Sequence, residues 1–499
     1  MAKLGIQLLQ QYIIINWKEL IYVIKMIIEP FFTKGIAHSS YLLGDLDTCA
    51  VVDPRRDVEI YVDAARSLGM KITHILETHL HADFVSGHID LARETGGKIC
   101  VPMLGNCEFD NVGLSEGDSF KIGNMVLDVL ETPGHTPDHI TYVVTDEARG
   151  KEPSCIFCGD TLFVGDVGRP DLFPGRAEKL ASDLYESLHS KLLTLPDFCE
   201  VYPAHGAGSL CGRAMGAKRS STIGYEKLYN DALQIKDRDK FIESLTTEMP
   251  AAPDHFSRCS ETNRKGPALI EDLSEPKPLD PLAFKSIAEE KNTIVLDIRS
   301  YEAFGGQHIP RAYNIDFGGN FATFAGWIVP PDKDILLVSE TIEQAEEAVV
   351  WLRRVGLDNT IGFLDGKIHA WVNQGLPTNH VNQLSAEELH DRITKAESGL
   401  LVDVRARSEF EIRHIEGAIN IPVPELRIRH TELDIDMQIT LICRTGHRSS
   451  LAASLLKQQG FRNASSVAGG MAGYNAAGYA LECPMCSIPH GPRFLGRPN

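Results

Sequence analysis

The sequence predicts a chain of three α/β domains, in which a larger layered domain is followed by two smaller domains that repeat each other. In the first half, short apolar segments alternate with helical segments and end in polar loops, as in layered α/β proteins. In the second half, Asp297 aligns with Asp403 and His308 with His414, both pairs lying 106 positions apart. A period of this length indicates two copies of one unit. The length of 499 residues also favours several domains.

The composition is that of a soluble globular protein, with 43% apolar and 23% charged residues. The net charge of -19 argues against nucleic-acid binding, which needs clustered Lys and Arg. The 11 cysteines show no tight framework, which is typical of free thiols in a reducing compartment. No apolar run has the length of a signal peptide or a membrane span, so we expect a cytoplasmic protein without membrane contact.

We expect the following division: an N-terminal extension over residues 1–25, the first domain over 26–250, a charged and Pro-punctuated linker over 251–275, the two repeats over 276–380 and 381–482, and an irregular tail over 483–499. The extension precedes a second possible start at Met26; an amphipathic surface helix is the alternative. Each repeat alternates buried strands with helices, which predicts a parallel sheet.

In the first domain, apolar and polar periodicity predicts the following elements in order: a hairpin over residues 41–44 and 49–53, a helix over 58–68, a strand over 72–76, a helix over 88–95, strands over 125–130 and 155–157, a helix over 180–193, and a strand over 200–202.

Four polar clusters in this domain each follow an apolar strand. They are His79, His81, Asp83 and His88 in ETHLHADFVSGH; His135 and His139; Asp160; and His205. Loops after the strands of a sheet converge on one edge, where sites are built. Imidazoles with carboxylates suit zinc or iron. For His74, His88 and His139 taken singly, a structural role is preferred to a ligand role.

The motifs THLHADF, PGHTPDH, CGDTLF and PAHG resemble the metallo-β-lactamase superfamily pattern over about 200 residues. The resemblance implies an αβ/βα sandwich with the metal at one edge of the sheets. In the glyoxalase II branch a dinuclear site carries the signature HxHxDH. Here Phe84 stands at the last position, and a phenyl ring cannot bind a metal, which favours a mononuclear centre.

The run GDVGRPDLF after Asp160 is similar to that of persulfide dioxygenases, also called sulfur dioxygenases. That resemblance implies one Fe(II) held by two His and one Asp, and the matching positions are His79, His135 and Asp160. His81, Asp83 and His205 would then orient ligands or water. A zinc enzyme is the alternative, and it would use His81 directly.

Three further residues are candidates for substrate binding. Arg169 and Arg176 could clamp a carboxylate of a thiol such as glutathione, with surface salt bridges as the alternative. Cys211 follows His205 in a Gly-rich loop, where it could meet the substrate or be a small buried thiol.

The loop CRTGHRS begins at Cys443, between an apolar strand and a helix. Helix N-terminal N–H groups, together with Arg444, His447 and Arg448, favour a thiolate or persulfide anion there. The spacing CxxxxR is shorter than the CxxxxxR of tyrosine phosphatases. With DVRxxxEF and HIxGAINIP, residues 385–481 resemble a rhodanese, a sulfurtransferase. The resemblance implies that Cys443 carries the persulfide and that Arg444 and Arg448 assist catalysis.

The first repeat has the rhodanese outline but an altered loop, SETIEQA, in which Ser339 stands at the position of Cys443. A hydroxyl cannot become a persulfide, so we expect this repeat to be inactive. The pair Cys483 and Cys486 in the tail is a single CxxC, which is weak evidence for metal or redox chemistry.

These features predict a persulfide dioxygenase fused to tandem rhodanese domains. Its substrates would be a small-molecule thiol persulfide, O2 and sulfite, its cofactor one Fe(2+) per first domain with Zn(2+) as the alternative, and its role sulfide detoxification. We expect a homo-oligomer. The alternatives are a zinc-dependent thioester hydrolase of the glyoxalase II type fused to a rhodanese, and a non-enzymatic sulfur-carrier module.

Overall fold

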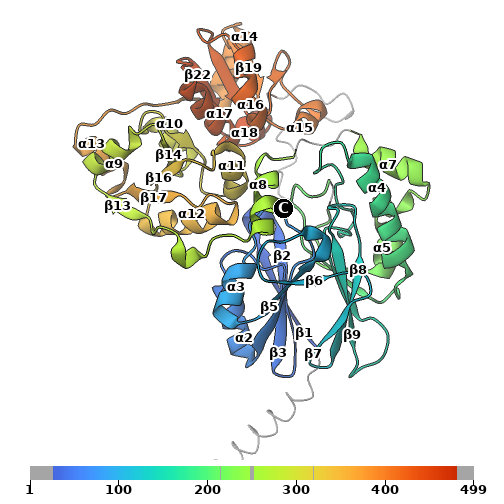
Figure 1. Cartoon of the computed structure of the whole chain (residues 1–499). Coiled ribbons are helices and arrows are strands. Elements are labelled where there is room, and N and C mark those ends of the chain that lie inside the picture. Colours follow the sequence, from blue (N-terminus) through green and yellow to red (C-terminus); the bar gives the residue numbers. More distant parts are fainter. Residues whose placement is uncertain (1–25, 214, 248–251, 319, 480–499) are drawn as a thin grey trace, which may run out of the picture. The chain divides into compact units, whose positions relative to one another are not determined.

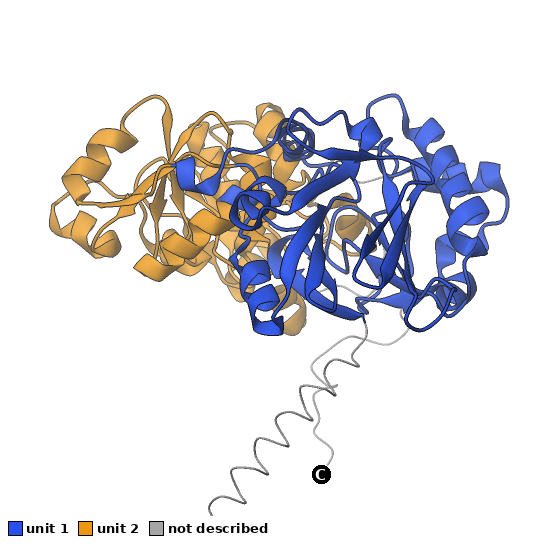
Figure 2. Ribbon diagram, turned by 60° about the horizontal axis from the view of Figure 1, so that its bottom comes forward, with its two compact units in different colours: residues 1–273, 353–356 blue, residues 274–352, 357–499 orange. Residues whose placement is uncertain are grey.

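The computed structural model describes residues 26–213, 215–247, 252–318 and 320–479. The chain divides into two compact units (Figure 2): unit 1 contains residues 1–273 and 353–356, and unit 2 contains the remainder. The N-terminal extension and the tail with Cys483 and Cys486 lie outside the described residues. Among the helices of the described residues, none is both long and apolar enough to cross a membrane.

Unit 1 contains two six-stranded sheets, ordered β1-β2-β3-β4-β5-β6 and β12-β11-β10-β9-β8-β7. The strands of the first are β1 (Ile27–Thr33), β2 (His38–Asp45), β3 (Thr48–Val52), β4 (Lys71–Leu76), β5 (Lys98–Pro102) and β6 (Val112–Leu114). Those of the second are β7 (Ser119–Ile122), β8 (Met125–Glu131), β9 (Ile140–Asp146), β10 (Cys155–Gly159), β11 (Glu200–Pro203) and β12 (Ser221–Thr222). The sheets pack face to face through buried side chains such as Leu43, Leu76, Leu127 and Tyr142. This arrangement confirms the predicted αβ/βα sandwich.

Helices cover the outer faces of the two sheets (Figure 1). They are α2 (Glu59–Leu68), α3 (His88–Thr95), α4 (Ala177–Glu186), α5 (Ile223–Tyr229), α6 (Asp231–Gln234) and α7 (Arg238–Thr246). A further helix, α8 (His255–Lys265), contacts the loop that carries His81. The single helix expected over residues 180–193 is three segments, because α4 passes into a π-helix, Ser187–Lys191, and then a 3-10 turn, Leu192–Thr194. Leu184, Leu188 and Leu192 stay buried throughout, so burial of this face persists while the backbone changes.

Residues 251–275, expected as a linker, differ from that expectation. Residues 255–265 form α8, and the side chains of Phe256, Cys259 and Asn263 are buried. Charged residues mark the exposed face of this helix, and they gave the segment its linker-like composition. The first unit therefore extends to residue 273.

Unit 2 contains two five-stranded parallel sheets of the same order, β13-β17-β16-β14-β15 and β18-β22-β21-β19-β20. The first repeat consists of β13 (Lys277–Leu279), α9 (Pro281–Ala288), β14 (Thr293–Asp297), α10 (Tyr301–Gly306), β15 (Tyr313–Asn314), α11 (Phe321–Ile328), β16 (Asp334–Val338), α12 (Ile342–Arg354), β17 (Thr360–Leu364) and α13 (Lys367–Asn373). The second consists of β18 (Asn382–Leu384), α14 (Ala386–Thr394), β19 (Leu400–Asp403), α15 (Arg407–Ile412), β20 (Ile419–Asn420), α16 (Val423–Arg429), β21 (Ile439–Ile442), α17 (His447–Gln458), β22 (Ala464–Val467) and α18 (Gly470–Ala476).

The two domains of unit 2 confirm the repeat predicted from the sequence, and they share individual hydrogen bonds as well as strand order. Asp297 accepts hydrogen bonds from Arg299 within the first repeat, and Asp403 accepts the same bonds from Arg405 in the second. All four side chains are buried. These pairs hold the ends of β14 and β19, an interior strand of each sheet.

Candidate functional site

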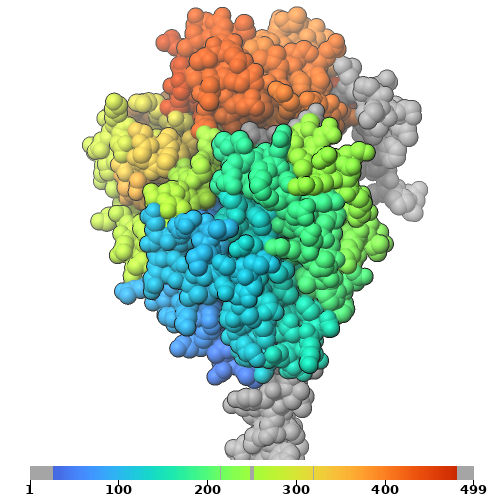
Figure 3. Space-filling model, turned by 45° about the vertical axis from the view of Figure 1, so that its right-hand side comes forward, coloured from blue at the N-terminus to red at the C-terminus, as the bar shows by residue number. Residues whose placement is uncertain are grey.

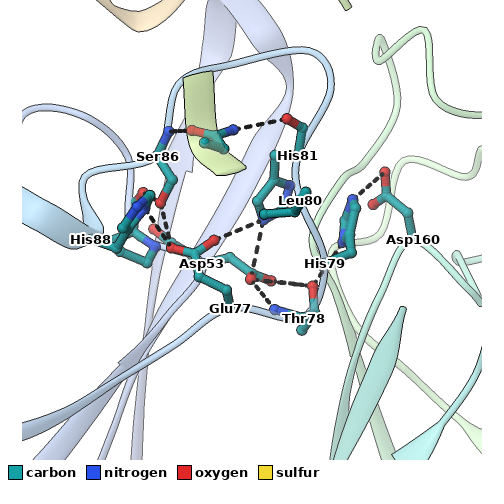
Figure 4. Close-up of polar contacts among 12 residues, drawn as sticks. Asp53, Glu77, Thr78, His79, Leu80, His81, Ser86, His88 and Asp160 are labelled. Atoms are coloured by element: carbon teal, nitrogen blue, oxygen red, sulfur yellow. Dashed lines mark hydrogen bonds and ion pairs between the residues drawn. The ribbon is translucent and has the colours of Figure 1, made fainter. Parts of the chain in front are cut away.

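The loops that follow the strands of unit 1 bring the predicted clusters together. His79 follows β4, His135 lies between β8 and β9, Asp160 follows β10 and His205 follows β11. All four side chains are at most 1% exposed, so they contribute almost nothing to the molecular surface drawn in Figure 3. Figure 4 shows His79 and Asp160 facing each other across the gap between the two sheets.

His79, His135 and Asp160 each offer one ligand atom, and these atoms lie within 4.8 Å of one another. His135 Nε2 lies 3.3 Å from Asp160 Oδ2, and His79 Nε2 lies 3.9 Å from the same oxygen. Two imidazoles and a carboxylate at this spacing can share one metal ion. The structure thus brings together the three residues that the resemblance to persulfide dioxygenases predicts as ligands.

The hydrogen bonds around the two imidazoles set their tautomers. His135 Nδ1 donates to the carbonyl of Arg169 at 3.0 Å, which leaves its Nε2 lone pair free. That Nε2 is buried and makes no hydrogen bond within the described residues. Thr78 donates its hydroxyl to Asp53, so the same oxygen accepts from His79 Nδ1 at 2.9 Å. Both rings therefore present a bare Nε2 to the site, as a metal requires.

Burial lowers the pKa of His79 and of His135, and neighbouring imidazoles lower that of His79 further. Burial alone would raise the pKa of Asp160, but the charge and hydrogen bonds of His205 outweigh it and lower that pKa. The triad is thus two neutral imidazoles and one carboxylate, the protonation states that bind a divalent metal.

His205 lies behind the triad, between two carboxylates. Its Nδ1 donates to Asp160 Oδ1 at 2.8 Å, and its Nε2 lies 2.8 Å from Asp83 Oδ2. Burial alone would lower its pKa, but Asp160 and Asp83 raise it well above the usual value. Both ring nitrogens are engaged with carboxylates, so His205 supports Asp160 in this structure, as expected for a residue that orients a ligand.

His81 points away from the triad toward a separate acidic pair. Its Nε2 lies 3.1 Å from Asp53 Oδ1 and 3.7 Å from Glu77 Oε2 (Figure 4). Burial opposes protonation, but Asp53 and Glu77 together raise the pKa of His81. The motif alone did not reveal Asp53 and Glu77, although each follows directly on an apolar strand as the other clusters do.

Phe84 fills the position where a second metal ligand would stand in the dinuclear branch. Its ring is fully buried, with its centroid 4.1 Å from that of His38 and 4.5 Å from that of His81. Burial lowers the pKa of His38 well below the usual value, so this imidazole is neutral. Sequence analysis missed His38, because its approach to His81 and His205 depends on a long-range bridge between His38 and His205.

For the residues considered for substrate binding, the sequence left a salt bridge or a buried thiol open as the alternative. Arg169 is buried, forms a bidentate pair with Asp171 at 2.6 and 2.7 Å, and donates to the carbonyl of Leu210. Arg176 is exposed and lies over Phe173. Cys211 is buried, and its sulfur lies within 4.8 Å of a ligand atom of Asp83 and of His205.

The GDVGRPDLF run lies directly against the metal site. A Cβ atom on Gly168 would lie 2.0 Å from the carbonyl oxygen of Asp160 and 2.9 Å from Cβ of His135. No larger residue fits there, so the run passes close enough for the Arg169 carbonyl to orient His135. This contact gives a physical reason for the motif.

Helix α8 fixes the loop that carries His81. Asn263 Nδ2 donates to the carbonyls of His81 at 2.8 Å and Phe84 at 2.9 Å, and its Oδ1 accepts from the Ser86 N–H at 2.8 Å. One buried amide thus satisfies three backbone groups of the loop.

Asn263→Ala should destabilise unit 1 by about 2–4 kcal/mol, because three buried backbone groups lose their partner. Denaturant unfolding of the full chain measures this, and Glu261→Ala, at an exposed position of the same helix, should stay close to the parent. Equal unfolding midpoints for the two variants would show that Asn263 does not fix the loop.

In unit 2, Cys443 lies at the bottom of its loop and is 1% exposed. Its sulfur accepts the Gly446 N–H at 3.1 Å and contacts the Ser449 hydroxyl at 3.5 Å. Arg448, predicted to assist catalysis, forms a two-pronged pair with Glu409, while Arg444 is exposed. Backbone and hydroxyl groups at the start of α17 thus surround the sulfur.

The corresponding loop of the first repeat is built differently. Ser339 is buried and donates its hydroxyl to the Thr341 carbonyl at 2.8 Å. Glu340 is exposed beside it. This loop therefore carries a hydroxyl in place of the thiol, beside an acidic side chain.

Comparison with known proteins agrees with this architecture. The model of the metallo-beta-lactamase superfamily matches residues 33–205, and that of the rhodanese-like domain matches residues 280–374 and 385–477. The persulfide dioxygenase ETHE1, mitochondrial, of Mus musculus is 31% identical over 235 residues, which cover 45% of this chain and 84% of that protein. A hydroxyacylglutathione hydrolase of Rhizobium johnstonii is 37% identical over 158 residues, covering 31% of this chain and 56% of that protein.

A crystal structure described as a metallo-beta-lactamase from Staphylococcus aureus subsp. aureus COL has 34% sequence identity and a TM-score of 0.62, and the match covers 68% of this chain and 99% of that one. Persulfide dioxygenase relatives and rhodanese-like domains indicate an enzyme of sulfur metabolism, and the superfamily implies a bound metal. The chain therefore belongs to the metallo-beta-lactamase superfamily, in the family of the ETHE1 persulfide dioxygenases, and carries two rhodanese-like domains after its metallo-beta-lactamase domain.

Proposed function

We propose that unit 1 oxidises a low-molecular-weight thiol persulfide, such as glutathione persulfide, and that Cys443 then transfers sulfur to the product. In the first reaction, a persulfide, O2 and water give the free thiol and sulfite. The observation that carries this proposal is the buried triad of His79, His135 and Asp160, whose two imidazoles present bare Nε2 atoms beside one carboxylate.

The triad is the 2-His-1-carboxylate set of non-haem iron(II) oxygenases, and its residues would hold one iron(II) ion. When bound, this ion supplies open positions at which a persulfide sulfur and O2 meet. The protein orients the three donors. The Arg169 carbonyl holds His135, Thr78 holds His79, and His205 holds Asp160 by hydrogen bonds of 2.8 and 3.0 Å. These partners orient the donors, burial keeps both imidazoles neutral, and His205 keeps the Asp160 carboxylate ionised.

Cys443 would carry sulfane sulfur in the second reaction. Its thiolate attacks the outer sulfur of a second persulfide, which releases the thiol and leaves a persulfide on Cys443. Sulfite then attacks that outer sulfur, which gives thiosulfate and returns the thiolate. The Gly446 N–H donates to the Cys443 sulfur and stabilises its negative charge in both steps.

Placing both activities on one chain suits the chemistry of sulfite, which is a reactive nucleophile. A tethered acceptor sees a higher effective concentration of sulfite than a separate enzyme would. The overall role would be the detoxification of sulfide.

A zinc-dependent thioester hydrolase is the second candidate, because hydroxyacylglutathione hydrolases are also among the relatives. In such an enzyme Asp83 and His205 would contribute to a second metal. Phe84 removes one ligand from that site, and its ring is packed against His81.

Phe84→His should allow a second metal ion to bind, because the new imidazole adds a donor beside Asp83 and His205. We expect the metal content of zinc-supplemented protein, measured by mass spectrometry of the metal, to rise from about one towards two ions per chain. Phe84→Leu removes the ring without adding a ligand and should stay at about one. Two ions in the parent protein would contradict the mononuclear site.

The two candidate functions separate in one experiment. The full chain is purified anaerobically, its metal is measured, and O2 uptake is followed with glutathione persulfide. Hydrolysis of a glutathione thioester is measured on the same preparation under nitrogen. Iron with persulfide-dependent O2 uptake supports the dioxygenase; zinc with thioester hydrolysis and no O2 uptake refutes it.

A further inference from the structure

The repeat without a cysteine packs directly against the helix that begins at the Cys443 loop. Ser450 of α17 donates to Asn314 Oδ1 at 2.6 Å, and the Asn314 N–H donates to Ser454 Oγ at 3.1 Å. All three side chains are buried. Strand β15 of the first repeat therefore fixes one face of α17, whose N-terminal end closes the loop.

Tyr301, at the start of α10 in the first repeat, lies against the backbone of this loop. Gly446 has a φ of 111°, and a Cβ atom there would lie only 2.8 Å from Cζ of Tyr301. Gly446 is also the residue whose N–H donates to the Cys443 sulfur at 3.1 Å. The tyrosine ring thus covers the peptide that holds the reactive sulfur, and only glycine allows this approach.

Asp316 of the first repeat holds the next residue of the loop. His447 Nδ1 lies 3.0 Å from Asp316 Oδ2, which also accepts the Tyr301 N–H at 3.2 Å. The Tyr301 and His447 rings lie 5.0 Å apart, edge to face. The hydrogen bond to Asp316 raises the pKa of His447, and the charge of Glu302 adds to this effect. These contacts orient the imidazole and favour its cationic form.

The corresponding positions of the second repeat carry neither group. They are 106 residues further along, where Arg407 replaces the tyrosine and Pro422 the aspartate. In the Ser339 loop, Glu343 occupies the position of His447. The sequence therefore provides these groups only in the first repeat, where they contact the Cys443 loop; the second repeat has no equivalent groups at the matching positions.

We propose that Tyr301 and Asp316 are positioning residues of the Cys443 site, so that the repeat without a cysteine forms one half of the sulfurtransferase site. Tyr301 would hold the Gly446 N–H against the sulfur, and Asp316 would keep a cationic His447 in the loop. This inference rests on the proposed sulfur transfer at Cys443. It also gives a defined role to a repeat that the sequence predicts to be catalytically inactive.

The test uses the full chain and the rate at which iodoacetamide alkylates Cys443, followed by peptide mass between pH 6 and 9. Asp316→Asn should slow alkylation near neutral pH by about three- to ten-fold, because loss of the carboxylate lowers the pKa of His447 and removes a cation from the loop that carries Cys443. The rates should converge with the parent wherever His447 has the same charge in both proteins. Asp332→Asn, an exposed change of the same type in the same repeat, should match the parent.

The double variant Asp316→Asn, His447→Gln shows whether Asp316 acts by positioning His447 or by stabilising the domain as a whole. Its alkylation rate should equal that of His447→Gln alone, because Asp316 acts through His447. A three- to ten-fold effect that persists without His447 would overturn the role of Asp316, and so would a parent-like rate in Asp316→Asn. Tyr301→Phe keeps the ring and should retain the parent rate, whereas Tyr301→Ala should not; equal rates would overturn the role of the ring.

Alkylation of Cys443 by iodoacetamide does not require that the protein transfers sulfane sulfur, so the two proposals can fail separately. Absence of thiosulfate formation by the parent protein would refute the proposed sulfur transfer. The response of Cys443 alkylation to Asp316→Asn would still decide whether the first repeat forms part of the site.

Discussion

We expect the substitution His135→Ala to abolish persulfide-dependent O2 uptake and to remove most of the iron from the purified protein. The substitution removes one of the three proposed ligands, and His205, the imidazole that contacts Asp160 from the other side, is held between two carboxylates. We expect kcat/KM with glutathione persulfide to fall by at least about 100-fold, because removal of groups that only support the ligands already costs metal sites 10- to 100-fold. An oxygen electrode and metal analysis of anaerobically purified protein measure both effects.

His74→Ala is the matched control for this experiment. His74 lies on β4, the strand that leads to His79, but its ring stacks on Phe120 and contacts Thr73. Its loss should leave both iron content and O2 uptake near the parent values. O2 uptake that survives in His135→Ala would show that this residue is not a ligand.

Cys443→Ala should change the product without stopping the first reaction. The triad lies in unit 1 and Cys443 in unit 2, so O2 uptake should continue near the parental rate. Sulfite should accumulate where the parent protein forms thiosulfate, because alanine cannot carry sulfane sulfur. Ion chromatography of the products should show thiosulfate formation reduced by at least about 100-fold, the scale expected when a covalent catalyst is removed.

Ser339→Ala is a control at the corresponding position of the first repeat. The Ser339 hydroxyl bonds only within its own loop among the contacts described, to the Thr341 carbonyl. The ratio of thiosulfate to sulfite formed by Ser339→Ala should equal that of the parent. Unchanged products in Cys443→Ala, or a shift to sulfite in Ser339→Ala, would refute the division of labour between the two repeats.

The positions of the strands, the cluster of polar loops and the two repeated domains could be predicted, because they depend on patterns within short segments of the sequence. Alternating apolar strands locate the loops, and the polar residues after each strand identify His79, His135 and Asp160 as members of one cluster. The 106-residue period predicts two domains of identical topology, which the two sheets of the same strand order confirm. Period and strand position are properties of the chain alone, so no knowledge of tertiary contacts was needed.

Residues whose roles depend on distant partners could not be assigned in this way. For Arg169 the sequence left a substrate clamp and a salt bridge open, and the structure shows its guanidinium bound to Asp171 and the Leu210 carbonyl. Asn263 lies in a segment whose composition suggested a linker, yet its side chain holds the loop that carries His81. In both cases the hydrogen-bond partners depend on which loops lie close together in the folded protein. The sequence around Arg169 or Asn263 does not indicate which loops these are.

By itself, therefore, the sequence predicted the sandwich, the repeated domains, the cluster of His79, His135 and Asp160 with Phe84 nearby, and the single cysteine loop of the rhodanese type. Only the tertiary structure decided which nitrogen the imidazoles of His79 and His135 present to the site, because the Arg169 carbonyl and the Thr78 hydroxyl set their tautomers. It alone also placed Tyr301 and Asp316 beside the Cys443 loop. The physical reason is that hydrogen-bond direction and close packing arise between segments far apart in the chain, whereas strand periodicity and loop chemistry arise within one segment.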